Sequence, residues 1–245
     1  MTFTWYDARA GACDGDCNGW IGAVGVITGD TPAKFDAFVK GRNLSGATVV
    51  LDSSGGSVLD SIAMGRRWRD LRLKTSVGIV IERTPVGGGV ERDVLPNAYC
   101  ESMCVFLLLS GETRTIPAGA HVRVHQIWMG DRAVDAKAAS YTAQDLMIVE
   151  RDIGRLAKYT FEMGGSGDLL ALALSVPPWE ALHELTEDEL RLTNLLPSDA
   201  VANAKPVQDR FVNAEPAAKS APLKSTRTAA AEAPTGGAAT VPEPK

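Results

Sequence analysis

Residues 99–126 read YCESMCVFLLLSGETRTIPAGAHVRVHQ, and they place a serine and a histidine on two successive elements. Ser102 stands at the start of an apolar run, Val105 to Leu109, which predicts a buried helix. His125 stands at the end of an alternating segment, which predicts a strand. A hydroxyl becomes an effective nucleophile when a neighbouring base takes its proton, so this pair could support acyl transfer.

A glycine pair upstream could supply a further part of the same chemistry. Gly55 and Gly56 follow the buried strand expected at 47–51 and precede a helical pattern. Bare backbone N–H groups in such a place could hold an oxyanion, although the pair could equally form a simple tight turn. No Lys-Ser/Thr follows the glycines, which disfavours a nucleotide-phosphate loop.

Each candidate also has an ordinary structural explanation. A serine at a strand-to-helix junction is most often an N-cap, and a histidine on a strand is usually structural. His121, which shares a strand face with His125, and His183 are the other candidate bases. We prefer His125 because it lies nearer the carboxyl end of its strand, where sites in parallel α/β sheets cluster.

The bulk composition sets limits on the partners. The 245 residues carry 25 basic and 30 acidic side chains, a formal net charge of −5, which gives no electrostatic reason to expect nucleic acid. The apolar runs are shorter than the ~20 residues of a membrane-spanning helix. Residues 1–7 have neither the basic nor the apolar region of a secretory signal, so the chain as given would be cytoplasmic.

The four cysteines form two pairs of equal spacing, Cys13/Cys17 and Cys100/Cys104. They could form disulfides, which would indicate an oxidising compartment, or remain buried thiols. Two C-x-x-x-C pairs could also bind one zinc ion, but a metal at Cys104 would crowd Ser102.

We expect three segments along the chain: a cysteine-containing start (1–19), an α/β domain (20–204), and a disordered tail (205–245) rich in alanine and proline. In the domain, strands and helices alternate, which predicts a mainly parallel sheet. The expected strands are 20–28, 47–51, 75–81 and 121–128, and the expected helices are 31–39, 58–71, 102–109 and 142–163. Residues 83–97 are expected to form a loop or lid.

Three motifs together resemble the proteolytic subunit of the Clp protease. They are VVLDSSGGSV at 49–58, ESMCVFLLLSG at 101–111 and VHQ at 124–126, and they agree with that family in order and spacing. The resemblance spans roughly 20–200 and implies a Clp/crotonase-like spiral of βαβ units. The cysteine-rich start and the CESMC segment look more like a bacterial branch of predicted periplasmic Clp-like proteins.

The resemblance implies a role for each matching residue. Ser102 would be the nucleophile and His125 the general base. The N–H of Met103 and that of Gly55 or Gly56 would bind the oxyanion. The long helix at 142–163 would mediate homo-oligomerisation.

The resemblance fails at the third member of the triad. The family has an aspartate at the position that falls near Leu182, and leucine cannot orient an imidazole. Glu180 and Glu184 lie nearby but out of register, so a shifted acid, a Ser–His dyad or a decayed site all remain open. Glu101, Cys100 and Cys104 also replace the small residues usual around the nucleophile.

The sequence thus favours a Clp-like serine hydrolase, a peptidase that needs no cofactor or metal and acts on a peptide or protein substrate. The alternatives are a catalytically decayed binding or scaffold protein, and a crotonase-type enzyme for acyl-coenzyme A. No segment matches those that dock an unfoldase, so such a partner is not expected. The resemblance and the cysteine pairs favour a periplasmic location, which the missing signal leaves open.

Overall fold

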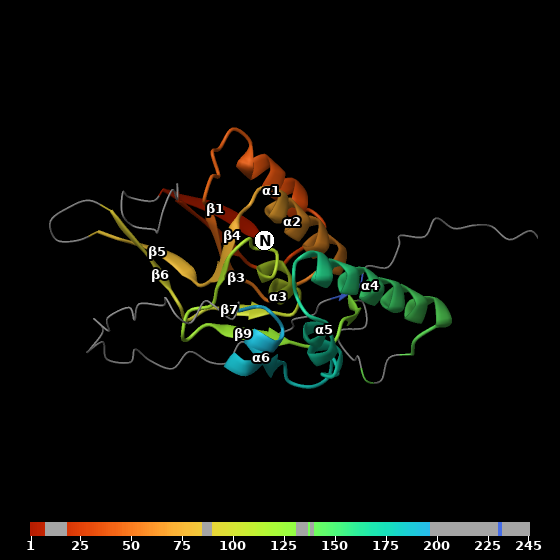
Figure 1. The fold of residues 1–245 in the computed structure, drawn as a ribbon. Helices are drawn as coiled ribbons and strands as arrows, with labels where there is room; N and C mark the ends of the chain where they lie inside the picture. The colour runs from red at the N-terminus through yellow and green to blue at the C-terminus, as the bar shows by residue number, and fades with distance from the viewer. Residues whose placement is uncertain (8–18, 85–89, 131–136, 138–139, 197–229, 232–245) are drawn as a thin grey trace, which may run out of the picture.

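The computed structural model describes residues 1–7, 19–84, 90–130, 137, 140–196 and 230–231 (Figure 1). Its central sheet has the strand order β1-β2-β3-β4-β8. These strands are β1 (Thr2–Asp7), β2 (Gly19–Val24), β3 (Thr48–Asp52), β4 (Lys74–Val77) and β8 (Arg114–Thr115). The neighbours from β2 to β8 are parallel, whereas β1 runs antiparallel to β2.

A smaller sheet lies beside the central one and carries the strands nearest to Ser102. Its order is β11-β9-β7, with β7 (Tyr99–Glu101), β9 (His121–Val124) and β11 (His183–Glu184). β7 is parallel to β9, and β11 is antiparallel to it. A separate hairpin, β5 (Ile79–Arg83) with β6 (Glu91–Leu95), projects from the body of the molecule (Figure 1).

Helix α3 (Met103–Leu108) is the centre of the core. Every one of its residues is buried, and it contacts β4, β7, β9 and α2. The other helices are α1 (Thr31–Val39), α2 (Val58–Asp70), α4 (Ala143–Glu162), α5 (Gly167–Leu174) and α6 (Glu187–Leu192). Wholly apolar sequence therefore gives a helix that is covered on all sides, as the run from Val105 to Leu109 predicts.

Hydrogen bonds from neighbouring elements hold the far end of α3. The Arg69 guanidinium donates to the carbonyl oxygens of Leu109, Ser110 and Gly111, which follow the helix. The Tyr159 hydroxyl donates to the Phe106 carbonyl at 3.0 Å. These donors satisfy carbonyls that a helix leaves unpaired at its C-terminus, so the helix that follows Ser102 is fixed in place.

The structure confirms the α/β class and corrects several details. The sheets are mixed, so a mainly parallel sheet in a βαβ spiral is not confirmed. Residues 79–83 and 91–95, expected partly as strand and partly as loop, instead form the two strands of the β5–β6 hairpin. Asp30 is the N-cap of α1, and its side chain makes no capping hydrogen bond.

The two ends of the chain also differ from expectation. β1 lies within the expected N-terminal segment, yet it pairs with β2 in the central sheet. In the expected tail, Ala230–Ala231 form β12, which is parallel to β10 (Trp128–Met129). The rest of the tail, 205–229 and 232–245, lies outside the described residues, as do Cys13 and Cys17.

Candidate functional site

Ser102 occupies a sharp junction between β7 and α3. Its backbone has φ 56° and ψ −123°, a region that residues other than glycine rarely adopt. Ser102 is the N-cap of α3, but its side chain makes no capping hydrogen bond. The ordinary explanation for a serine at a helix start therefore does not account for Ser102, which sits in a strained turn with its side chain buried.

The pairing of β7 with β9 brings His125 beside this junction. Glu101 lies opposite Arg123 in the parallel ladder, and the Ser102 N–H donates to the Arg123 carbonyl at 2.8 Å. Ser102 directly follows β7, and His125 directly follows β9. The two residues thus directly follow the carboxyl ends of two adjacent parallel strands.

His125 is held in an apolar environment. It is 4% exposed, and its ring packs edge-on against Trp128 with 4.7 Å between centroids. Burial lowers the pKa of His125 to about 4, because the charged imidazolium loses hydration there. The ring is therefore neutral at neutral pH and has a nitrogen available to accept a proton.

The two polar atoms of this pair are both buried and unpaired. Neither Ser102 Oγ nor His125 Nε2 has a hydrogen-bond partner within the part of the chain that the structure describes. The two side chains consequently do not hydrogen bond to each other. Catalytic hydrogen bonds are often long in the unliganded state and tighten around the substrate, so the missing hydrogen bond does not by itself exclude a Ser–His pair.

The glycine pair lies against the same junction. A parallel bridge between Ser53 and Cys100 aligns the end of β3 with β7. Gly55 has φ 86°, and a Cβ at this position would lie 2.8 Å from the Met103 nitrogen and 2.9 Å from Ser102 Cβ. Only glycine permits this approach, so the loop and the start of α3 meet at Ser102.

The N–H groups of this loop are not equivalent. The Gly55 N–H donates to Ser53 Oγ at 3.1 Å, so it is already engaged. The N–H groups of Gly56 and Met103 donate to no acceptor among the described residues. Ser53, which the sequence analysis did not single out, thus fixes the loop and leaves Gly56 and Met103 as the available donors.

A disulfide between Cys100 and Cys104 brackets Ser102. Cys100 is in β7 and Cys104 is in the first turn of α3, and both are fully buried. The covalent link joins the two elements whose junction holds the strained serine. It also engages both sulfurs, which are therefore neither free thiols nor zinc ligands in this structure.

Glu184, a candidate acid for His125, has its carboxylate bound to other residues. Glu184 lies opposite Arg123 in the antiparallel ladder, with its carboxylate 2.6 Å from His121 Nδ1 and 3.0 Å from Arg123 Nε. The hydrogen bond with His121, followed by that from Arg123, lowers the pKa of Glu184. Leu182, a residue without a polar group, directly precedes β11 at the end of the ladder where His125 directly follows β9.

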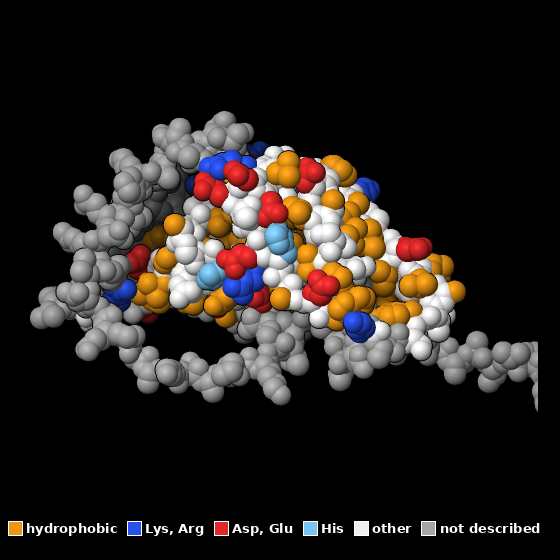
Figure 2. All heavy atoms as spheres, turned by 90° about the horizontal axis from the view of Figure 1, so that it is seen from below, with side chains coloured by type: hydrophobic (Ala, Val, Ile, Leu, Met, Phe, Trp, Pro, Cys, Tyr) orange, Lys and Arg blue, Asp and Glu red, His pale blue; other side chains and the backbone are white. Residues whose placement is uncertain are grey.

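The remaining candidates do not contact His125. The exposed Glu180 makes no side-chain hydrogen bond to any residue that the structure describes. His183 Nε2 lies 2.9 Å from Glu189. Histidine, acidic and basic side chains gather near the centre of the face seen in Figure 2. His121 and His183 are thus already paired with carboxylates, whereas His125 is not.

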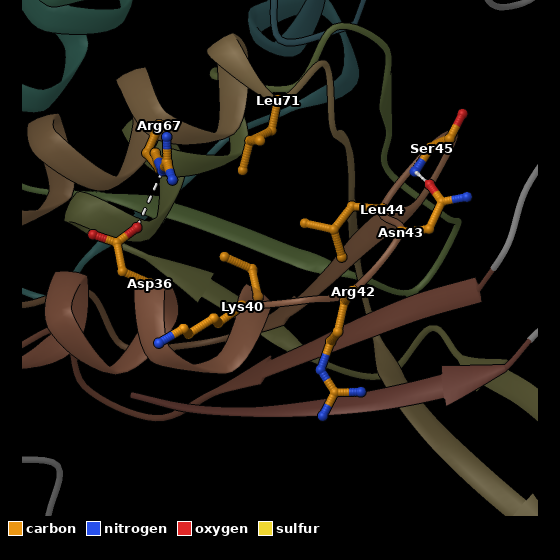
Figure 3. Close-up of a pocket in the computed structure, with 9 residues that line it drawn as sticks. Asp36, Lys40, Arg42, Asn43, Leu44, Ser45, Arg67 and Leu71 are labelled. Carbon is orange, nitrogen blue, oxygen red and sulfur yellow. Dashed lines mark hydrogen bonds and ion pairs between the residues drawn. The ribbon is translucent and has the colours of Figure 1, made fainter.

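A pocket of about 460 Å³ lies elsewhere, between α1, α2 and the loop at 40–45 (Figure 3). Lys40 and Arg42 line it, and Arg67 Nε donates to Asp36 across it at 3.1 Å. The lining includes the hydroxyl of Ser45 but no histidine that could act on it. The pocket therefore does not combine the groups found at Ser102.

Two observations concern metal ions and membranes. Within the described residues, no three His, Cys, Asp or Glu side chains gather closely enough to hold a metal ion. No helix in the same residues has the length and apolar character needed to cross a bilayer.

Comparison with known proteins finds a match only in structure. No family model matches the chain, and no curated protein is similar to it in sequence. Among solved structures, the ClpP protease catalytic domain from Plasmodium falciparum is similar, with a TM-score of 0.43 and 11% identity. The match covers 72% of this chain and 81% of that chain. At this level of similarity, neither the family nor the activity of this protein follows from the match.

Proposed function

We propose that this protein is a Clp-like serine hydrolase that cleaves peptides through an acyl-enzyme on Ser102. The observation that carries the proposal is that Ser102 and His125 are both buried and directly follow two adjacent parallel strands. Ser102 also has a strained backbone, and its side chain makes no capping hydrogen bond. Strained backbone and unpaired buried polar atoms are costly, and in native proteins they concentrate at functional sites.

The proposed reaction uses four groups of the chain. Ser102 Oγ attacks the carbonyl carbon of the scissile bond while its proton passes to His125 Nε2. The N–H groups of Met103 and Gly56 donate to the oxyanion that forms. His125 then protonates the leaving amine, and the same residue activates a water molecule that hydrolyses the Ser102 ester.

A second candidate function is a binding protein that has kept this architecture without catalysis. The observation that favours it is the position of Leu182, because an imidazole without an orienting acid is a weaker base. A crotonase-type enzyme, the third candidate, would use the Gly56 N–H for a thioester enolate. It would bind coenzyme A, and its activity would be insensitive to Ser102→Ala.

Labelling with a fluorophosphonate probe distinguishes these functions, because the probe reacts only with an activated serine. We expect labelling of the wild type and none of Ser102→Ala, and we expect His125→Ala to slow it roughly 10²–10⁴-fold. Ser54→Ala and His121→Ala are the matched controls and should label at the wild-type rate. Folded wild type that resists the probe would favour the binding protein, and coenzyme A affinity would favour the crotonase type.

Leu182→Asp tests the role of the missing acid. A carboxylate that reached His125 from position 182 would raise the pKa of the imidazole and orient it, so we expect labelling to accelerate about tenfold or more. Leu182→Asn is the control, because it has nearly the same shape without the charge. Equal rates for the two variants would contradict the proposed contact.

A further inference from the structure

Glu101 directly precedes Ser102, and its side chain is buried. The residue is only 4% exposed, although an acidic side chain is rarely buried unless a cation pairs with it. Arg123 supplies such a cation, because its Nη1 donates to Glu101 Oε1 at 3.2 Å. Arg123 therefore offsets part of the cost of burying a carboxylate beside the proposed nucleophile.

Arg123 lies on the central strand of the small sheet and contacts both neighbouring strands. In addition to Glu101 on β7, it binds Glu184 on β11, to which its Nε donates at 3.0 Å. Its guanidinium carbon also lies 5.0 Å from the centroid of the Tyr99 ring in β7. A planar guanidinium with contacts on several sides has little freedom to move, so it fixes β7 relative to β9 and β11.

The main chain of Arg123 holds the next residue after β7. Its carbonyl accepts the hydrogen bond from the Ser102 N–H at 2.8 Å. Arg123 thus binds Glu101 through its side chain and Ser102 through its backbone. The φ of 56° at Ser102 costs free energy, and such a conformation persists only where the surrounding contacts fix it. The contacts of Arg123 act on the strand side of this junction, before α3 begins.

We propose that Arg123 is a positioning residue, which holds Ser102 in its left-handed conformation through Glu101 and thereby determines how fast the hydroxyl reacts. The effect on the reaction rate rests on the proposed hydrolase function, whereas the effect on the conformation does not. Arg123 lies in β9, which leads directly to His125. The ion pair therefore also fixes the segment of the nucleophile against the strand of the base.

Three variants of the full chain test this role: Arg123→Gln, Glu101→Gln and the two together. Arg123→Gln removes the guanidinium from a buried carboxylate next to Ser102, so we expect the maximal rate of fluorophosphonate labelling to fall roughly 10- to 100-fold. Glu101→Gln removes the buried charge itself and should lower the rate less. The double variant has no carboxylate at position 101, so it should react faster than Arg123→Gln alone.

Arg92→Gln is the matched control. The Arg92 side chain is 23% exposed, against 27% for Arg123, and its Nε donates to Glu82 on the neighbouring strand at 2.7 Å. It belongs to the β5–β6 hairpin and not to the small sheet, so its loss should leave labelling unchanged. Arg123→Lys keeps the charge without the planar fork and should recover part of the rate that Arg123→Gln loses.

Two measurements separate positioning from a general loss of stability. The dependence of labelling on probe concentration gives the maximal rate and the half-saturating concentration, and a misplaced hydroxyl should lower only the maximal rate. Urea unfolding gives the folded fraction to which each rate refers. Hydrogen exchange at the Ser102 N–H should accelerate in Arg123→Gln and not in Arg92→Gln, whether or not the serine is reactive. If Arg123→Gln does not fold, Glu101→Gln and Arg123→Lys provide the same comparisons.

Each outcome decides a different part of the proposal. Unchanged exchange at Ser102 in Arg123→Gln and Glu101→Gln would overturn it. Accelerated exchange with a wild-type maximal rate in the folded protein would make Arg123 purely structural, which also overturns it. A double variant no faster than Arg123→Gln would exclude Glu101 as the link. A wild type that does not label contradicts the hydrolase function, and the exchange result alone then shows whether Arg123 holds Ser102.

Discussion

Ser102 and His125 each bury a polar atom that has no hydrogen-bond partner among the described residues. An unsatisfied buried group costs about 1–3 kcal/mol, and the positive φ of Ser102 adds a cost of similar size. The fold tolerates these costs at two adjacent positions, one after β7 and one after β9. At the scale of single residues, this coincidence distinguishes the site from the hydrogen-bonded serines and paired histidines elsewhere.

The buried imidazole predicts an acid-sensitive stability. His125 has a pKa of about 4 when folded, against 6.5 as its ordinary value, so below pH 6.5 the unfolded chain takes up a proton that the folded protein refuses. Stability should therefore fall as pH decreases from about 6.5 to 4, and His125 should account for about 3 kcal/mol of the loss. Urea unfolding of the wild type and His125→Gln at pH 7.5 and pH 4.5 measures this loss.

The comparison between variants isolates His125 from the acidic groups that titrate nearby. His125→Gln should lose about 2–3 kcal/mol less than the wild type between the two pH values. His183→Gln, at a half-exposed residue paired with Glu189, is the control and should keep the wild-type fall. If the wild type and His125→Gln lost stability in parallel, His125 would not be buried and neutral.

The sequence predicts that Ser102 and His125 stand at the ends of elements, but it does not predict which residues Glu184 contacts. Ser102 precedes an apolar run and His125 ends an alternating segment. Such local patterns determine where an element begins or ends. The partner of Glu184 depends instead on the register between β11 and β9, which are far apart in the chain. That register pairs Glu184 with Arg123 and His121, and no local pattern encodes it.

At the scale of elements, the closeness of α2 to α4 keeps α3 in place. A Cβ at Gly65 in α2 would lie 1.7 Å from the Tyr159 hydroxyl oxygen in α4. The same hydroxyl donates to the Phe106 carbonyl of α3. Gly65 thus permits the approach that lets Tyr159 reach α3, so a side chain at position 65 would separate these helices.

Gly65→Ala should lower the free energy of unfolding by about 1–3 kcal/mol, because the methyl group overpacks a fully buried contact. Gly154→Ala is the matched control: Gly154 also lies within a helix, and a Cβ there would meet open space. This control should be neutral or stabilising by about 0.5–1 kcal/mol. Thermal and urea unfolding measure both variants, and equal effects would contradict the close contact.

Elements that depend on local sequence were predicted better than elements that depend on contacts between distant segments. Helices α1, α2 and α4 have their own caps or periodic apolar faces, and the structure places them close to the expected bounds. The β5–β6 hairpin and β1 were missed, because antiparallel neighbours are chosen by contacts between segments rather than within one. The glycines and prolines of 83–97 indicate a loop, yet Glu91–Leu95 form a strand within this region.

At the scale of the whole molecule, α4 exposes apolar side chains at both ends. Leu146 and Met147 are 52% and 60% exposed near its start, and Phe161 is 64% exposed near its end. Figure 1 shows α4 reaching out from the body of the molecule. Exposed apolar surface of this kind is typical of an interface, so homo-oligomerisation through α4 remains our prediction.

Light scattering tests this prediction. The wild type should have a mass that is a multiple of 26.0 kDa, and Leu146→Glu with Met147→Glu should shift it towards 26.0 kDa. Lys158→Glu adds negative charge at an exposed position of the same helix and should leave the mass unchanged. A monomeric wild type would contradict the predicted assembly.

The bond between Cys100 and Cys104 closes a small ring of chain around Ser102, and this has a consequence for where in a cell the protein could work. Glutathione keeps most protein thiols reduced in the cytosol, whereas secreted proteins retain such links. With the ring open, the backbone of Ser102 would be freer to relax out of its left-handed conformation. The thiol–disulfide balance of the surroundings would then determine how well the Ser102 hydroxyl is positioned.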